Sequence, residues 1–266
     1  MKVCIIGSYA KALVMTADRI PVAGETLMGR DYRGEFGGKG SDMAVQSSRL
    51  GAEVSYIGVI GDDTFGKEFV DLMKDEKIDI SGLRITKEKS TGTGFIIKDI
   101  EARNVIVVDS GANDLFSKED IDNAEKLIEE ADVVLAQLEI PLDTALYAMK
   151  VAKKYGKTTI LNPAPAVNLK ECDLSDVDIL TPNETEARVA VGVPTDSELT
   201  NSEIFNGCAA LNPLAKNIIN DPIINNKFAL VTNIPPIDAT FAILLIPLDD
   251  KNVINITKTA PNIPNV

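Results

Sequence analysis

The chain has 266 residues, of which 45% are apolar, so it can form one large domain or one domain with a small appendage. Its formal net charge of −13 disfavours nucleic acid and anionic membranes as partners. The sequence contains no histidine, which excludes Ser-His-Asp and Cys-His catalysis and leaves proton transfer to a carboxylate or a lysine.

The first predicted element is a buried strand at residues 3–6, a short apolar run that ends at a Gly-Ser pair. The stretch 13–31 alternates irregularly and contains proline and glycine, so we expect short strands and turns outside the main sheet. Residues 32–36 then lead into a glycine-rich segment.

Three glycines in four residues mark the segment 37–42. Glycine permits positive φ angles and a close approach of ligand to backbone. Small and apolar residues follow at helical spacing over 43–51, so we expect a helix whose N-terminus opens from this segment and presents unpaired N–H groups to hydroxyls or an anion. The spacing is not that of a Walker A loop. A flexible turn is the alternative, and the segment alone does not separate the two.

Strands and helices alternate through the next part of the chain. We expect strands at 54–60, 133–136, 158–161 and 177–180, and helices at 65–76, 117–130, 142–155 and 183–191. This alternation predicts a parallel sheet covered by helices on both faces. Residues 93–98 and 104–109 predict two strands joined by a polar turn, which could form a small separate sheet with the strands before the glycine-rich segment.

The last quarter of the chain has a different composition. No glycine follows Gly207, and seven of the 13 prolines lie beyond it. Strands are still indicated at 228–232 and 241–246, but a compact α/β domain usually needs glycine in its connections. We therefore expect an irregular or poorly specified segment there.

The expected compartment is the reducing cytoplasm. No apolar run is long enough to cross a membrane, and the N-terminal apolar stretch is too short for a secretory signal. The three cysteines are widely spaced and include no Cys-x-x-Cys pair, which disfavours a disulfide framework or a zinc site.

Seven motifs, in order over roughly residues 1–210, together resemble the ribokinase branch of the phosphofructokinase-B family of carbohydrate kinases. They are FGGKGSD (36–42), GVIGDDTFG (58–66), STG (90–92), GAN (111–113), QLE (137–139), NPAPA (162–166) and TPNETEA (181–187). The resemblance implies a ribokinase-like α/β fold, with a central mostly parallel sheet flanked by helices and a small β-sheet lid over the sugar. It implies ATP and Mg²⁺ as cofactors, a sugar such as ribose as substrate, and a homodimer formed through the lid.

On this basis the chain is a single domain over 1–266, with its lid built from parts of 10–36 and 91–109 and an atypical tail at 208–266. The resemblance implies that Gly38, Lys39, Asp42 and Glu139 bind the sugar, although the family prefers Asn where Asp42 stands. From the residues alone, the alternative is that Glu139 is an ordinary exposed acid at a strand end, and this is the less favoured interpretation.

Asn183 and Glu186 match the family's Asn-x-x-Glu pair near the phosphates and magnesium. Residues three apart share a helix face, and a carboxylate behind an amide could hold hydrated Mg²⁺ through water. An Asn N-cap with Glu at the third helical position is also close to a capping box, which needs no ligand.

The chain departs from the family pattern in places that matter for activity. Ala10 and Ala12 stand where the family has Asn and Asp to hold sugar hydroxyls, and the glycine-rich anion hole that ends in the general base is missing. Asp238 is the only candidate for that base, and a turn carboxylate is the better interpretation of it. The sequence therefore leaves three hypotheses: a sugar kinase, a catalytically weak or inactive relative, and a non-enzymatic dimerisation or regulatory module.

Overall fold

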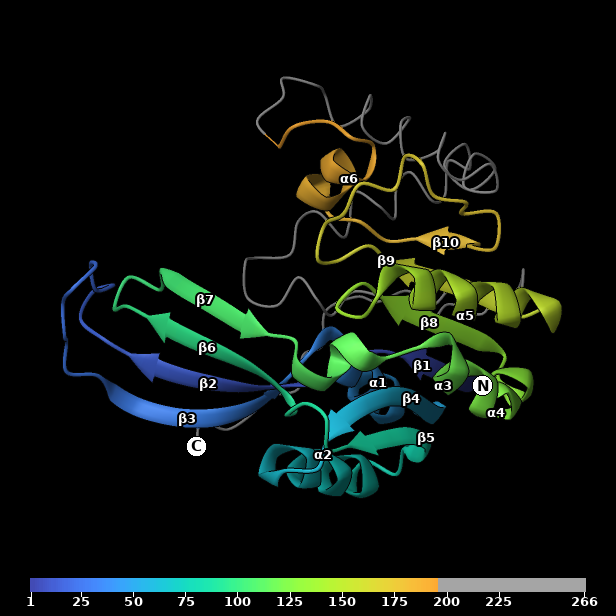
Figure 1. Cartoon of the computed structure of the whole chain (residues 1–266), viewed down its shortest axis with the longest axis horizontal. Helices are drawn as coiled ribbons and strands as arrows, with labels where there is room; N and C mark the ends of the chain where they lie inside the picture. Colours follow the sequence, from blue (N-terminus) through green and yellow to red (C-terminus); the bar gives the residue numbers. More distant parts are fainter. Residues whose placement is uncertain (196–266) are drawn as a thin grey trace, which may run out of the picture.

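The structure is a computed structural model that describes residues 1–195. It has a central sheet of six parallel strands and a separate sheet of four strands, which projects from one end of the central sheet (Figure 1). The strand order of the central sheet is β10-β9-β8-β1-β4-β5. Its strands are β1 (Lys2–Ile6), β4 (Glu53–Gly61), β5 (Asp79–Thr86), β8 (Val133–Gln137), β9 (Thr158–Asn162) and β10 (Ile179–Leu180). The predicted α/β fold is confirmed.

Helices cover both faces of the central sheet. Alternate residues of each strand point to opposite faces, so each face has its own layer of core. Val3 and Ile5 of β1 pack against α1 (Lys39–Arg49) and α2 (Thr64–Asp75). Cys4 and Ile6 face the other side and join the core formed with α3 (Lys118–Asn123), α4 (Glu125–Glu130) and α5 (Leu142–Lys154). The strand residues in both layers of core are buried, as a parallel sheet covered on both faces requires.

The small sheet has the order β3-β2-β6-β7. Its strands are β2 (Ala10–Thr16), β3 (Arg30–Gly37), β6 (Gly92–Lys98) and β7 (Asn104–Asp109). The chain enters it twice, after β1 and after β5, so two excursions from the central sheet pair with each other. β2 and β6 run parallel, and the outer pairs are antiparallel. The strands fall in the two segments predicted for the lid, apart from the last residue of β3.

Asp63 joins the two sheets. It caps α2, accepting a hydrogen bond from the Gly66 N–H at 2.8 Å, and it also accepts bonds from the Thr91 N–H at 2.7 Å and the Thr91 hydroxyl at 2.8 Å. Burial raises the pKa of Asp63, but these hydrogen bonds outweigh it and hold the pKa below its ordinary value. The carboxylate thus ties the end of β4 to the start of β6.

Several element boundaries differ from the sequence prediction. The helix after the glycine-rich segment begins at Lys39 instead of 43, so most of that segment is the first turn of α1. The helix predicted over 117–130 is two helices that meet at Ala124, where φ is −108° and ψ is 12°. β5 was not predicted, because this edge strand lacks a continuous apolar run. Only the last two residues of the predicted strand 177–180 pair, forming β10.

Within residues 1–195, every helix is too short or too polar to cross a bilayer.

Candidate active site

A cavity of about 540 Å³ opens beside the small sheet. Its lining comes from β2, β6 and β7, from the start of α1, and from the residues that follow β1 and β8. The ends of parallel strands are where ligands bind in such sheets. The residues that line it are Ser8, Ala10, Ala12, Gly37, Gly38, Gly94, Ile96, Ile106, Val108, Ser110, Asn113, Asp114, Leu138, Glu139, Ile140, Pro141 and Pro165.

Glu139 is an acidic residue in the lining of this cavity. Its Oε2 accepts hydrogen bonds from the Ser8 hydroxyl at 2.6 Å and from the Lys39 N–H at 2.8 Å. The Gln137 amide donates in turn to the Ser8 hydroxyl at 2.7 Å. A carboxylate at a helix N-terminus is stabilised by the unpaired N–H groups and the helix dipole. Glu139 is therefore half-buried and held in place, and it is not a freely exposed acid.

Glycine is required where α1 begins. Gly38 has a φ of 93°, and a Cβ there would lie 2.8 Å from the Tyr9 Cα. A Cβ on Gly40 would lie 2.5 Å from the Ser8 N. The helix start therefore packs directly against the β1–β2 connection, and the Ser41 N–H donates to the Ser8 carbonyl at 3.0 Å. This packing excludes the flexible turn and fixes the position of the Lys39 N–H.

Three of the four residues expected to bind sugar lie together. Gly38 and Glu139 line the cavity, and the Lys39 N–H bonds the Glu139 carboxylate. Asp42 lies half-buried in the first turn of α1 and is not among the lining residues. Asp238 lies outside the described residues, as does the tail at 208–266.

Asn183 and Glu186 stand apart from the cavity, at the start of α6 (Glu184–Ala190). The Asn183 side chain accepts from the Glu186 N–H at 2.8 Å, and the Glu186 carboxylate accepts from the Asn183 N–H at 2.9 Å. The Asn183 amide also donates to the Glu186 carboxylate at 2.9 Å. Both bonds of a capping box are therefore formed, in agreement with the alternative that needs no ligand.

The sequence analysis did not assign Ser8, Gln137 or Asn113 to the site. The Asn113 side chain accepts from the Tyr9 N–H at 3.1 Å and donates to the Tyr9 carbonyl at 2.8 Å, so it holds the chain between β1 and β2. Gln137 and Asn113 lie in motifs that carry the family resemblance, whereas Ser8 lies in the Gly-Ser pair that follows the first strand. These places in the sequence were the signal that could have identified them as part of the site.

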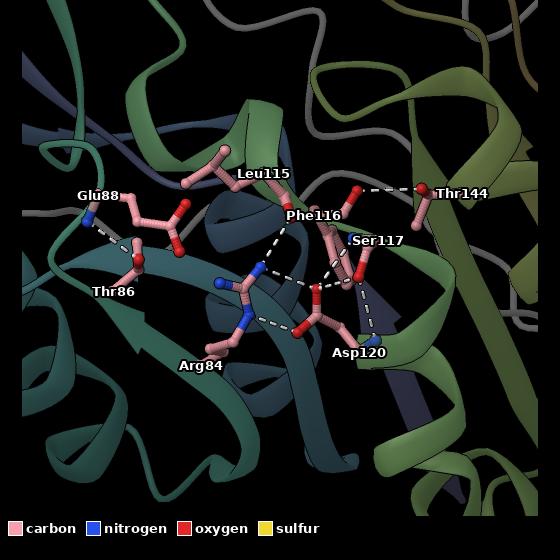
Figure 2. Close-up of polar contacts among 8 residues, drawn as sticks. All are labelled: Arg84, Thr86, Glu88, Leu115, Phe116, Ser117, Asp120 and Thr144. Carbon is pink, nitrogen blue, oxygen red and sulfur yellow. Dashed lines mark hydrogen bonds and ion pairs between the residues drawn. The ribbon is translucent and has the colours of Figure 1, made fainter.

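A polar network supports the side of the cavity formed by the 3₁₀ helix η1 (Gly111–Leu115) (Figure 2). Arg84 of β5 donates to the Leu115 carbonyl at 2.7 Å and to both oxygens of Asp120, at 2.5 and 3.0 Å. Asp120 also accepts from the Ser117 N–H and hydroxyl, both at 2.9 Å. Burial raises the pKa of Asp120, but these hydrogen bonds outweigh it and lower the pKa. The network fixes the end of η1, which carries Asn113.

Comparison with known proteins agrees with this arrangement. Residues 1–211 match the pfkB family carbohydrate kinases. The chain belongs to the pfkB family of carbohydrate kinases. Within this family it is 39% identical to ribokinase from Haemophilus influenzae over 194 residues, which is 73% of this chain and 63% of that protein. It is 39% identical to ribokinase from Staphylococcus aureus over 198 residues, covering 74% of this chain and 65% of that protein. The chain thus spans less than two thirds of the length of these two relatives.

A solved structure of a pfkB family relative has the same architecture. Arabidopsis thaliana ribokinase, complexed with ribose and ATP, superposes with a TM-score of 0.71 at 26% sequence identity. The superposition covers 79% of this chain and 69% of that one. The family predicted from the motifs is therefore confirmed.

Proposed function

We propose that this chain binds a sugar and phosphorylates its hydroxymethyl group with ATP. The single observation that carries the proposal is Glu139, a carboxylate held by Ser8 and the Lys39 N–H in the lining of a cavity beside the small sheet. Carboxylates accept hydrogen bonds from sugar hydroxyls strongly, because charged acceptors form the stronger bonds. Gly38, Lys39, Asp42 and Glu139 would bind the sugar, and the small sheet would cover it as a lid.

ATP would supply the phosphoryl group, with Mg²⁺ neutralising charge on the phosphates. Asn183 and Glu186 are the residues that would lie near them. A carboxylate has about four lone-pair sites, so Glu186 can accept from Asn183 and still accept from a metal-bound water. Within residues 1–195, no three His, Cys, Asp or Glu side chains are grouped closely enough to bind a metal directly. Glu186 would therefore act through water.

In the reaction, a carboxylate would take the proton of the hydroxymethyl group as its oxygen attacks the γ-phosphate in line. The new O–P bond forms while the bond to the leaving ADP oxygen breaks. Asp238 remains the proposed base, since the sequence has no histidine. Because Ala10 and Ala12 replace polar side chains and the anion-hole motif is missing, we expect weak ribose binding and slow transfer.

The alternative is a catalytically inactive sugar-binding or dimerisation protein, and one observation favours a dimer. On the face of the small sheet opposite the cavity, Phe95 and Val107 are 59% and 65% exposed, and Val105 is exposed beside them. Apolar surface of this kind marks interaction sites. We propose a second copy of the chain as the partner. The proposed compartment is the cytoplasm. The mass in solution tests the dimer.

Product analysis tests the kinase proposal. The full chain, at high concentration, is incubated with Mg·ATP and ribose, and sugar phosphate is sought by mass spectrometry. We expect slow formation of ribose phosphate, and none with the Glu139→Gln variant. If the wild type binds sugar in a titration but forms no phosphate, the inactive alternative is correct.

A further inference from the structure

Lys11 is a charged residue on the face of β2 that points away from the cavity. Its neighbours Ala10 and Ala12 line the cavity. Alternation therefore places Lys11 on the opposite face of the strand, together with Leu13 and Met15. Only 8% of the Lys11 side chain is exposed. An ammonium group that is this far buried is costly unless other groups compensate it, so its contacts indicate what it does.

These contacts join the small sheet to α2. The Lys11 ammonium donates a hydrogen bond of 2.6 Å to the carboxylate of Glu68, a residue of α2 that is 41% exposed. The Lys11 Nζ also lies 4.5 Å from the ring centroid of Phe36 in β3 and 6.0 Å from that of Phe65 in α2. Aromatic rings attract a cation at these distances. A carboxylate and two rings, drawn from the sheet and the helix, therefore surround one ammonium group.

The neighbouring strand leaves room for the Lys11 side chain. A Cβ added to Gly34 of β3 would lie 2.8 Å from the Lys11 Cε. A larger residue at position 34 would therefore push the lysine side chain aside. Lys11 is paired with Phe36 in the strand register, so the side chain lies across β3 beside its own pairing partner.

The contacts of Lys11 lie close to the backbone that holds Glu139. Phe36 is the last residue but one of β3, and α1 begins at Lys39. The Lys39 N–H donates to the Glu139 carboxylate at 2.8 Å. Three residues thus separate the ring beneath the ammonium from the N–H that holds the carboxylate. The position of the end of β3 determines where this N–H lies.

We propose that Lys11 is a positioning residue for sugar binding, which fixes the end of β3 against α2 through Glu68 and Phe36. It thereby keeps the Lys39 N–H on the Glu139 carboxylate. The inference rests on the proposed function, since the sugar is taken to bind at Glu139. Lys11 itself is not among the residues that line the cavity. A buried ion pair adds little net stability over apolar packing, and its best-attested role is to fix the elements that it joins.

The variant Lys11→Met tests this inference in the full chain. Methionine keeps an unbranched side chain and suits an apolar face, and the exposed Glu68 carboxylate remains solvated. We therefore expect the midpoint of urea unfolding to stay unchanged. Ribose affinity, measured by calorimetric titration, should fall by at least about fivefold, the lower end of typical coupling between separate sites. A residue with only a structural role would change affinity and midpoint together.

Two further sets of variants examine the contact itself. Lys67→Met makes the same change at an exposed lysine of α2 and should alter neither quantity. Glu68→Gln should lower ribose affinity as Lys11→Met does. The double variant Lys11→Met, Glu68→Gln should bind ribose no more weakly than the single variants, because both substitutions remove the same contact.

Hydrogen exchange measures the positioning without any sugar. In Lys11→Met, the backbone amides of residues 36–42 should exchange faster than in the wild type, because the end of β3 is no longer fixed against α2. The amides of β8 and β9 in the central sheet should exchange as in the wild type.

The outcomes separate this inference from the proposed function. If Lys11→Met binds ribose as the wild type does, the inference is wrong and the proposed function stands. If affinity and midpoint fall together, as for a destabilised core variant such as Ile128→Val, Lys11 is only structural and the inference is wrong. If the losses from Lys11→Met and Glu68→Gln add, Lys11 does not act through Glu68. If the wild type binds no ribose, the proposed function fails. Faster exchange at 36–42 would then still support the positioning of this segment, and unchanged exchange would overturn it.

Discussion

The Ser8 hydroxyl lies 2.6 Å from the Glu139 carboxylate, although 131 positions separate the two residues in the chain. Ser8 follows β1 and Glu139 follows β8, and these strands are neighbours in the central sheet. Parallel pairing therefore brings both to the same edge, where the start of α1 completes the arrangement. The account of sugar binding depends on this contact.

Replacing Glu139 by Gln should weaken sugar binding. A hydrogen bond to a charged group contributes about 1.5–3 kcal/mol, so affinity should fall by roughly 10- to 150-fold. Calorimetric titration with ribose measures the change. Glu101→Gln, an exposed acid in the turn between β6 and β7, is the charge-matched control and should bind like the wild type. Equal affinities for all three proteins would show that the Glu139 carboxylate does not bind the sugar.

Restoring polar side chains beside the glycine-rich segment should improve ribose binding. The double variant Ala10→Asn, Ala12→Asp returns the residues that the family has at these positions, and both line the cavity. Each new bond from a sugar hydroxyl adds about 0.5–3 kcal/mol, with the charged partner at the upper end. The titration compares ribose affinity with that of the wild type. If the two affinities are the same, the alignment of this segment with the family pattern is incorrect.

Removing the hydroxyl group should change the free energy of unfolding differently at two buried tyrosines. Tyr56 donates to the Gly7 carbonyl at 2.9 Å, whereas the Tyr9 hydroxyl is buried without a hydrogen-bond partner among residues 1–195. Both side chains are 1% exposed. We expect Tyr56→Phe to lower the free energy of unfolding by about 1–3 kcal/mol, and Tyr9→Phe to leave it unchanged or raise it. Urea denaturation measures both, and a larger loss for Tyr9→Phe would contradict this description of the core.

The Arg84–Asp120 network should make stability depend on pH in the acid range. The folded-state pKa of Asp120 is lowered, so its contribution is complete above the unfolded value of about 3.9 and is lost as the pH falls through the folded value. At pH 7, Asp120→Asn should cost about 1–3 kcal/mol. The difference from the wild type should shrink as the pH falls below about 4.

Urea denaturation at several pH values measures this difference. Glu119→Gln, an exposed acid on the same helix, is the control and should change stability by no more than about 0.5 kcal/mol. A difference between wild type and Asp120→Asn that stays constant with pH would show that the carboxylate does not act through its charge.

Local patterns in the sequence predicted much of the fold and part of the site. The apolar run of β1 and the alternation of strands and helices predicted the covered parallel sheet, and the i, i+3 spacing of Asn183 and Glu186 predicted their contact. These features depend on residues close in the chain. β5 was missed because an edge strand needs no continuous apolar run.

The contacts that build the site depend on residues far apart in the chain. No periodicity specifies that the residue after β1 meets the residue after β8, so Ser8 was not identified as the partner of Glu139. The motifs that include Asp63 and Asn113 were recognised, but their roles were not. The structure shows that Asp63 joins the two sheets and that Asn113 holds the Tyr9 backbone.

The most direct test of the account is the rate of ADP production with Mg·ATP across a panel of pentoses and hexoses. Losing one preorganised oxyanion donor typically lowers the rate by a factor of about 10²–10³, and the missing family motif would supply more than one donor. We therefore predict sugar-dependent turnover far below about 1 per second. Turnover in the ordinary range of about 1–10³ per second, abolished by Asp238→Asn, would contradict this and identify Asp238 as an effective base.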